Sequence, residues 1–187
     1  MSLPRVTQII RAAGLMPDGP WYTGHALDKG RALHAAIALH QAGTLDPASI
    51  DPQIAGRFAA YDAFLRAVQP DVLGCEVEGS GSGYAGRCDL LARIDGALFV
   101  LDAKPSPAPW HAVQLAAYQH QRYPGIHEPI VGRRILILTD DGRYRLIRPA
   151  AAPAEDWSVF LAALRLWHWR TANQITQPGE ETACRTL

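Results

Sequence analysis

The stretch GRCDLLARIDGALFVLDAK, residues 86–104, predicts a β-hairpin at the centre of the fold. Two runs rich in β-forming and apolar residues are separated by Asp95-Gly96, and an Asp-Gly pair in that setting is a strong signal for a two-residue turn. A turn at this place sets the register of the hairpin. Ile94 is then expected to pair with Ala97, Leu91 with Val100, and Asp89 with Asp102. The sequence therefore predicts which side chains meet across the two strands.

Two carboxylates and one ammonium group gather on one face of this hairpin. The register sets Asp89 opposite Asp102, with Cβ atoms roughly 4.5–5.5 Å apart, and strand alternation brings Lys104 to the same face. Facing carboxylates repel each other and lower hairpin stability, whereas a divalent cation such as Mg²⁺ binds carboxylate oxygens and relieves the repulsion. A solvated strand end without a ligand is the alternative. The coincidence of three charged groups favours a metal site, in which the lysine can stabilise charge on a phosphate.

The composition is that of a globular protein with one hydrophobic core. Of the 187 residues, 48% are hydrophobic and 19% are charged, and 18 basic residues balance 18 acidic ones. The zero net charge argues against tight non-specific binding to nucleic acid but leaves room for a local basic groove. We expect residues 1–177 to form a single domain and residues 178–187 to be a disordered tail.

Membrane, zinc-finger and iron–sulfur classes are disfavoured by the same sequence. No run of about 18 apolar residues is available to span a bilayer, and the first residues lack the apolar core of a signal peptide. Cys75, Cys88 and Cys184 are scattered and never in C-x-x-C spacing, which disfavours a zinc finger or a disulfide framework and fits a reducing cytoplasm. No iron–sulfur cluster is expected, because its set of four cysteine ligands is absent.

Hydrophobic periodicity predicts elements in the order ααα-βββ-α-ββ-α. Outside the hairpin, helices are expected at residues 6–15, 24–41, 52–69, 110–123 and 156–172, and strands at 72–79, 134–139 and 144–148. Asp51 is the expected N-cap of the third helix, and the glycine-rich residues 79–83 are expected to form a flexible connector. The predicted fold class is α/β, with a mixed central β-sheet flanked by helices and with helices at the N-terminal end.

Several polar residues outside the hairpin are further candidates for the site. They are His34 in the helix at 24–41, Glu76 and Glu78 on the strand at 72–79, and Gln114 and Tyr118, which share one face of the helix after Lys104. Each also has an ordinary interpretation. The histidine fits a partly buried helix position, the glutamine and tyrosine fit an amphipathic pair, and one of the two glutamates fits a solvated strand face.

Other aromatic and basic residues are assigned more simply. Surface positions are expected for His25, His111, His120 and His127, and core positions for Trp157, Trp167 and Trp169. Trp21-Tyr22 could stack on nucleic-acid bases or cap the core. A phosphate-binding edge, or a blunted edge strand, is expected from Arg133, Arg134, Arg143, Arg145 and Arg148.

Four motifs together resemble the PD-(D/E)XK nuclease superfamily, and most of all its RecB-like branch, which includes phage and prophage exonucleases and the mitochondrial genome-maintenance exonuclease. The motifs are Gly30-x-x-x-His34, Gly86-x-x-Asp89, Asp102-x-Lys104 and Gln114-x-x-x-Tyr118. The resemblance covers residues 30–118 and implies a restriction-endonuclease-like core. The sequence departs from the branch directly after the lysine, where threonine and then glycine or serine are common and Pro105-Ser106-Pro107 stand here.

The resemblance implies a metal centre for Mg²⁺ or Mn²⁺. Asp89 and Asp102 would bind the ion, the main-chain carbonyl of Ala103 would be a further ligand, and His34 would complete the shell from the helical side. Glu76 would lie near the metal, with Glu78 as its substitute if the register slips by two residues.

The resemblance also implies roles in catalysis and DNA binding. Lys104 would position the attacking water or stabilise the pentavalent phosphate. Gln114 and Tyr118 would support the site and contact the nucleic-acid backbone.

The function that the resemblance implies is a metal-dependent deoxyribonuclease. An exonuclease on single- or double-stranded DNA ends is favoured, acting in phage or bacterial recombination or DNA repair, in the cytoplasm of a bacterial or phage-infected cell. A single-strand-binding or annealing protein of recombination is a candidate partner. Two alternatives stay open. The first is a structure-specific or sequence-specific endonuclease of the same fold. The second is an inactive nuclease-like module that only binds DNA or protein, which the prolines after Lys104 favour and the intact set of Asp89, Asp102 and Lys104 disfavours.

Overall fold

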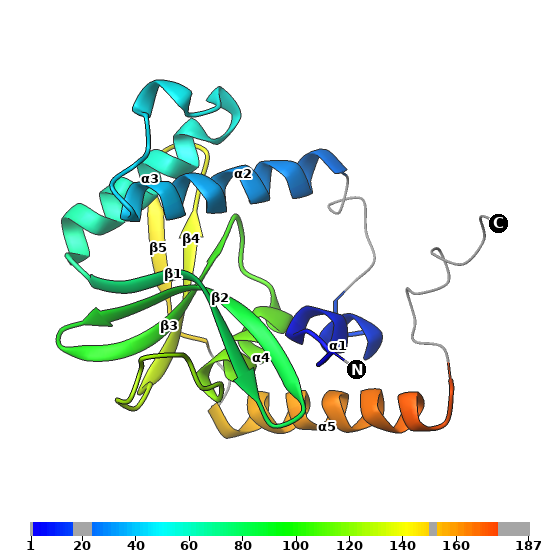
Figure 1. Ribbon diagram of the computed structural model, residues 1–187. Helices are drawn as coiled ribbons and strands as arrows, with labels where there is room; N and C mark the ends of the chain where they lie inside the picture. The colour runs from blue at the N-terminus through cyan, green and yellow to red at the C-terminus, as the bar shows by residue number, and fades with distance from the viewer. Residues whose placement is uncertain (1, 17–23, 150–152, 176–187) are drawn as a thin grey trace.

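The structure is a computed structural model in which residues 2–16, 24–149 and 153–175 are described (Figure 1). One mixed sheet contains five strands in chain order, and helices cover both of its faces. The strands are β1 (Asp71–Gly81), β2 (Tyr84–Ile94), β3 (Ala97–Lys104), β4 (Gly132–Leu138) and β5 (Tyr144–Ile147). The helices are α1 (Val6–Ala12), α2 (Gly24–Gln41), α3 (Pro52–Val68), α4 (Pro109–Gln119) and α5 (Pro153–Ala172). The predicted α/β class, with a mixed central sheet flanked by helices, is confirmed.

The predicted hairpin register is confirmed close to the turn. Ile94 pairs with Ala97, and the antiparallel ladder between β2 and β3 continues to Leu90 and Leu101. β3 then runs parallel to β4, with α4 as the crossover helix, and β5 returns antiparallel to β4. Beyond Leu90, β2 continues with β1 as its partner, so Asp89 and Asp102 lie at the place where the ladder between β2 and β3 ends.

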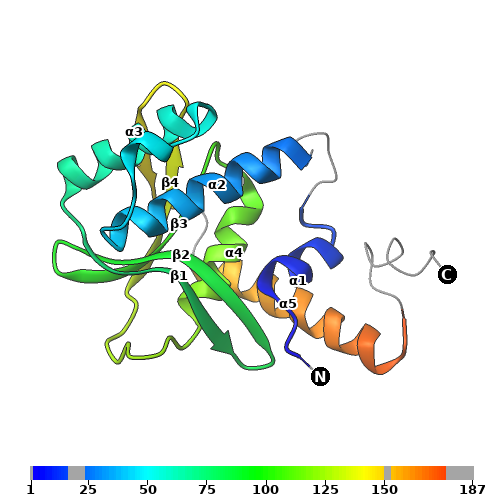
Figure 2. The ribbon, with the colours of Figure 1, turned by 45° about the horizontal axis from the view of Figure 1, so that its top comes forward.

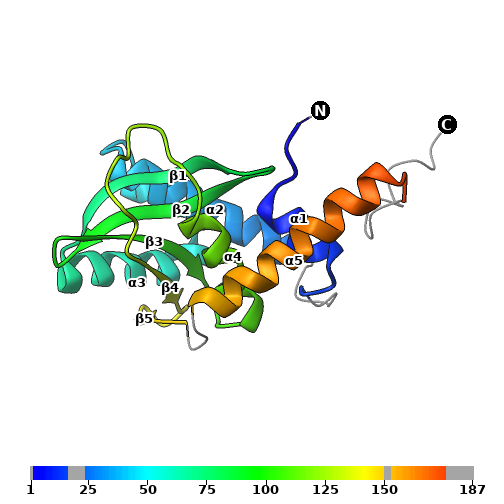
Figure 3. The same cartoon turned by 90° about the horizontal axis from the view of Figure 1, so that it is seen from below.

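Two hydrophobic clusters, one on each face of the sheet, form the core. α2 and α3 pack on one face with Leu90 and Leu101 of the sheet, as Figure 2 shows. α1, α4 and α5 pack on the other with Leu91 and Val100 (Figure 3). Neighbouring residues of one strand serve opposite clusters because side chains alternate along a strand. Within the described ranges, every helix is too short or too polar to cross a membrane.

The glycine-rich stretch at 79–83 is not the flexible connector that we predicted. β1 extends to Gly81, and only Ser82 and Gly83 form the turn, at which Gly83 has a φ of 84°. Gly79 lies so close to the ring of Tyr123 that a Cβ there would stand 2.6 Å from a ring carbon. The glycines therefore permit close packing and a tight turn.

Two predictions about single aromatic residues, those for His111 and Trp169, need correction, whereas His120 lies at the surface as predicted. His111 is buried, with 4% of its surface exposed, because α4 packs between the sheet and α5. Trp169 is 56% exposed, whereas Trp157 and Trp167 do pack partly against the core. His120 is exposed and stacks on Trp157, with ring centroids 3.9 Å apart. The predicted tail at 178–187, Cys184 and Trp21-Tyr22 lie outside the described residues.

Of the arginines proposed for a phosphate-binding edge, Arg133 lies in the interior, whereas Arg143, Arg145 and Arg148 are exposed. Arg133 is buried, forms an ion pair with Asp156 of α5 and donates to the carbonyl of Ala112 in α4 at 3.0 Å. The guanidinium of Arg134 lies 4.4 Å from the centroid of the Phe99 ring. The two contacts of Arg133 hold β4, α4 and α5 together.

Replacing Arg133 is expected to destabilise the fold strongly. Arg133→Ala leaves the buried carboxylate of Asp156 without its cation, and breaking such a pair lowers the free energy of unfolding by about 3 kcal/mol. Urea unfolding followed by circular dichroism measures the change. The control is Arg143→Ala, which removes an exposed ion pair with Asp141 and is expected to leave the midpoint unchanged. Equal unfolding midpoints for both variants would show that the buried ion pair of Arg133 does not stabilise the fold.

Candidate metal and phosphate site

Side chains from four elements meet where β2 and β3 separate. α2 contributes His34, β1 contributes Glu76 and β2 contributes Asp89, and one potential ligand atom from each lies within 4.8 Å of the other two. β3 contributes Asp102 and Lys104 beside them. These are the residues that the sequence proposed, although they lie far apart in the chain.

The imidazole of His34 connects the two carboxylates of this group. Its Nδ1 lies 2.9 Å from Oε1 of Glu76 and 3.5 Å from Oδ1 of Asp89. Burial disfavours the charged ring, but the neighbouring Asp89 and Glu76 outweigh burial and raise the pKa of His34 to about 9. The ring is partly buried and hydrogen-bonded, as an ordinary helix histidine would be, and its two partners are candidate ligands.

Glu76 reaches this position through an unusual backbone conformation. Its φ is 51°, in the left-handed region that residues other than glycine seldom adopt. The register of β1 against β2 also shifts by one residue between Val72 and Gly74, which is how a β-bulge re-aims a strand. Strain of this kind persists where the surrounding structure imposes it and is common at functional sites.

Glu78, the substitute for Glu76, lies outside the group. Both of its carboxylate oxygens accept from Arg5, at 2.8 Å each, and the pair is exposed to solvent. The structure thus places Glu76, and not Glu78, beside His34.

Asp89 and Asp102 are close together without forming a ladder pair. Oδ2 of Asp89 accepts from the main-chain nitrogen of Ala103 at 2.7 Å. Asp102 is fully buried, and its Oδ2 lies 2.8 Å from Nζ of Lys104. Burial raises the pKa of Asp102 above its ordinary value, an effect that Lys104 opposes and Asp89 reinforces.

Gln114 and Tyr118 meet as predicted, inside the protein. Nε2 of Gln114 donates to the tyrosine hydroxyl at 2.9 Å, and both residues are 4% exposed. Burial raises the pKa of Tyr118, and Asp102 and Asp89 add to the effect. The pair is therefore close to the carboxylates and packs in the core.

Two neighbours of the site escaped the sequence prediction. Nε of Arg87 lies 2.7 Å from Oε2 of Glu76, and the alternation that aligns Arg87 with Asp89 could have indicated it. The second neighbour is His111. Burial lowers the pKa of its ring, and the nearby charge of Lys104 lowers it further, to about 4. Its Nδ1 accepts from the main-chain nitrogen of Ala108 at 3.0 Å, a capping contact at the third position of α4.

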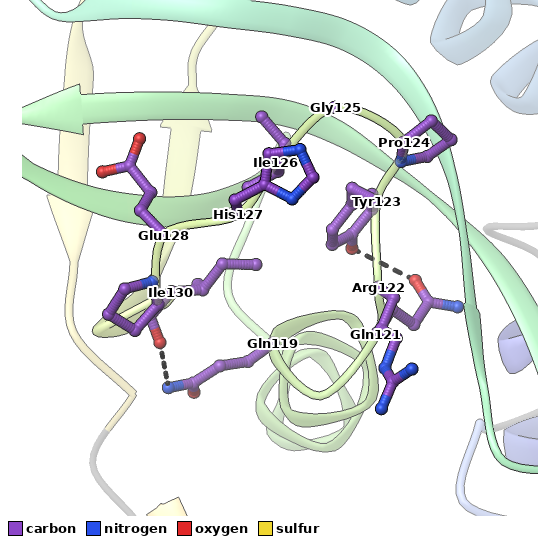
Figure 4. Close-up of a pocket in the computed structure, with 11 residues that line it drawn as sticks. Gln119, Gln121, Arg122, Tyr123, Pro124, Gly125, Ile126, His127, Glu128 and Ile130 are labelled. Atoms are coloured by element: carbon purple, nitrogen blue, oxygen red, sulfur yellow. Dashed lines mark hydrogen bonds between the residues drawn. The ribbon is translucent and has the colours of Figure 1, made fainter.

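A separate pocket of about 570 Å³ lies in the connection between α4 and β4 (Figure 4). Its lining comes from residues 119 and 121–130. Gln119 donates to the carbonyl of Ile130 across it, at 3.3 Å, and Tyr123 donates to Gln121 at 3.1 Å. The candidate ligands do not line this pocket, so it is distinct from the site described above.

Comparisons with known proteins give only distant similarities. No family model matches the chain, and the search of curated proteins found no match. The structure of an alkaline exonuclease from Laribacter hongkongensis is 14% identical, covers 92% of this chain and 94% of its own, and has a TM-score of 0.39. The same enzyme in complex with dAMP is 13% identical, covers 93% of this chain and 95% of its own, and has a TM-score of 0.36. The structure of SSO0001 is 17% identical, covers 87% of this chain and 75% of its own, and has a TM-score of 0.37.

A pair of substitutions tests the strain at Glu76. Glycine adopts positive φ without a steric penalty, so Glu76→Gly is expected to have a free energy of unfolding about 1 kcal/mol higher than Glu76→Ala. Both variants lose the same carboxylate, so their difference isolates the backbone. Urea unfolding in EDTA measures it, and a less stable glycine variant would show that the left-handed conformation is not strained.

Proposed function

We propose that the protein is a divalent-metal-dependent deoxyribonuclease of the PD-(D/E)XK type. The observation that carries the proposal is the convergence of His34, Glu76 and Asp89 from three elements, next to the Asp102–Lys104 ion pair. Each of these residues was a candidate from sequence, four of them within the motifs. Glu76 reaches the cluster through a left-handed backbone conformation, and such conformations are common at functional sites.

The residues present fit a hard divalent cation. Carboxylate oxygens are the preferred ligands of Mg²⁺ and Mn²⁺, and an imidazole nitrogen is acceptable to the latter. Oδ1 of the buried Asp102 has no hydrogen-bond partner among the described residues, and a cation would satisfy it. The ion would thus be held by His34, Glu76 and Asp89, with Asp102 and the carbonyl of Ala103 as the further predicted ligands.

The chemistry proposed is hydrolysis of a phosphodiester bond. A bound cation would supply Lewis-acid stabilisation of the charge that develops on the phosphate oxygens. Lys104 contributes a second positive charge for those oxygens, or orients the attacking water. Asp102 holds its ammonium group from one side, and the Trp110 ring centroid lies 6.0 Å from Nζ. Gln114 and Tyr118 form a rigid support close to the carboxylates.

Within this class we favour an exonuclease acting on DNA ends in phage or bacterial recombination or repair. Support comes from the resemblance of the four motifs to the RecB-like branch. An annealing or single-strand-binding protein is the partner that such a role implies.

An inactive DNA-binding module is the second candidate, favoured by the loop after Lys104. Pro105, Ser106 and Pro107 replace the threonine and small residue common in the branch. The loop ends at Ala108, whose main-chain nitrogen is held by His111. A hydroxyl group directly after the lysine is therefore missing from this chain.

A cleavage assay separates these candidates. End-labelled linear DNA, single- and double-stranded, and closed circular DNA are incubated with Mg²⁺, Mn²⁺ or EDTA. We expect metal-dependent loss of linear DNA only, and at least about 100-fold less of it with Lys104→Ala, because a charge near the reacting phosphate is removed. Nicking of circles would identify an endonuclease. Binding without cleavage under either metal would identify the inactive module.

The role of Asp102 is tested by Asp102→Ala. We expect cleavage to be abolished and Mn²⁺ affinity, measured by calorimetry, to fall by at least about tenfold. Stability in EDTA is expected to stay equal or rise slightly, because burial of Asp102 and its repulsion by Asp89 outweigh the ion pair with the partly exposed Lys104, as the raised pKa of Asp102 indicates. The control is Asp141→Ala, which lies in the exposed turn before β5. Unchanged cleavage in Asp102→Ala would overturn the site assignment.

A further inference from the structure

Arg87 borders the candidate ligands and is more exposed than they are. Its Nε lies 2.7 Å from Oε2 of Glu76, and 53% of its side chain is exposed. The side chains of Glu76 and Asp89 are only 23% and 14% exposed. The guanidinium is therefore accessible to a substrate that arrives from solvent, whereas the carboxylates lie deeper.

The neighbouring ion pair explains why Arg87 turns toward the site. The residue opposite Arg87 in the ladder between β1 and β2 is Glu78. Both oxygens of Glu78 accept from Arg5, so the acid directly across the ladder is already paired. Arg87 and Asp89 lie on the same face of β2, and on that face the ion pair of Arg87 is with Glu76.

Acidic and basic side chains are paired throughout the site. Three carboxyl groups meet three basic side chains, and the members are Glu76, Asp89 and Asp102 with His34, Arg87 and Lys104. A divalent cation bound to Glu76 would compete with Arg87 for the same carboxylate. The guanidinium presents five N–H donors in a planar fork that matches a phosphate.

We propose that Arg87 binds a backbone phosphate of the nucleic acid next to the metal site, and that its ion pair with Glu76 and a cation on Glu76 compete. The inference rests on the proposed function and adds a substrate-binding residue to it. Arg87 thus links metal binding to DNA binding. The cation weakens the ion pair between Glu76 and Arg87, and the phosphate then replaces Glu76 as the partner of the guanidinium.

Two affinities are expected to change in opposite directions in Arg87→Ala. The affinity for Mn²⁺ in the absence of DNA rises about threefold, because a competing cation is removed from Glu76. The affinity for labelled linear DNA with Mn²⁺ falls about tenfold, because a charge-assisted phosphate contact is lost. The slope of log affinity against log salt becomes shallower by about 0.9 for duplex DNA. Both are measured in the Lys104→Ala background, in which cleavage is expected to be at least about 100-fold lower.

Two companion variants separate substrate binding from structure. Arg66→Ala removes an exposed ion pair with Asp62 within α3, outside the site, and is expected to leave both affinities unchanged. Arg87→Lys keeps the charge but not the fork, so the salt slope is retained while DNA affinity falls by a few fold.

The outcomes distinguish this inference from the proposed function. DNA affinity and salt slope unchanged in Arg87→Ala would overturn the role of Arg87 while leaving the nuclease proposal intact. A parallel fall of metal affinity, DNA affinity and melting temperature in both Arg87 variants would make it a structural anchor and equally overturn the inference. Absence of both cleavage by the unaltered protein and DNA binding in the Lys104→Ala background would refute the proposed function, and the inference with it.

Discussion

The arrangement of the site depends on one hydrogen bond at the place where two strands part. The ladder between β2 and β3 ends at Leu90 and Leu101. One residue further on, a carboxylate oxygen of Asp89 takes the main-chain nitrogen of Ala103 as its donor. The side chain thus closes off the end of the ladder, while its other oxygen faces His34 at 3.5 Å. A single carboxylate thus accepts a hydrogen bond from the backbone with one oxygen and faces the candidate metal ligand His34 with the other.

Electrostatic compensation is the second constraint on this arrangement. Isolated carboxylates in a protein interior are unfavourable unless they are paired. Here each has a basic neighbour: Asp102 has Lys104, and Glu76 has both His34 and Arg87. The compensation comes from α2, β2 and β3, so the packing of a helix across the sheet and the charge balance of the site support each other.

Local sequence patterns predicted much of the fold, because they report local geometry. The Asp-Gly turn specified the register from Ile94 and Ala97 onward, and Asp51 caps α3 by accepting from the nitrogen of Gln53 at 2.8 Å. Periodicity is less informative about what covers a face. Trp169 lies in the last turn of α5, which extends past the sheet (Figure 3), and His111 is buried because α4 is covered on both sides.

By itself, the sequence determined the hairpin, the class of fold and the residue types available for a metal and a phosphate. Turn chemistry and side-chain alternation act over a few residues, and they require no knowledge of the rest of the chain. Only the tertiary structure decided that Glu76 rather than Glu78 joins His34, and that Arg87 borders the group. Those choices depend on a left-handed residue, a register shift in β1 and the ion pair between Arg5 and Glu78. Each of these arises from contacts between segments that are distant in sequence.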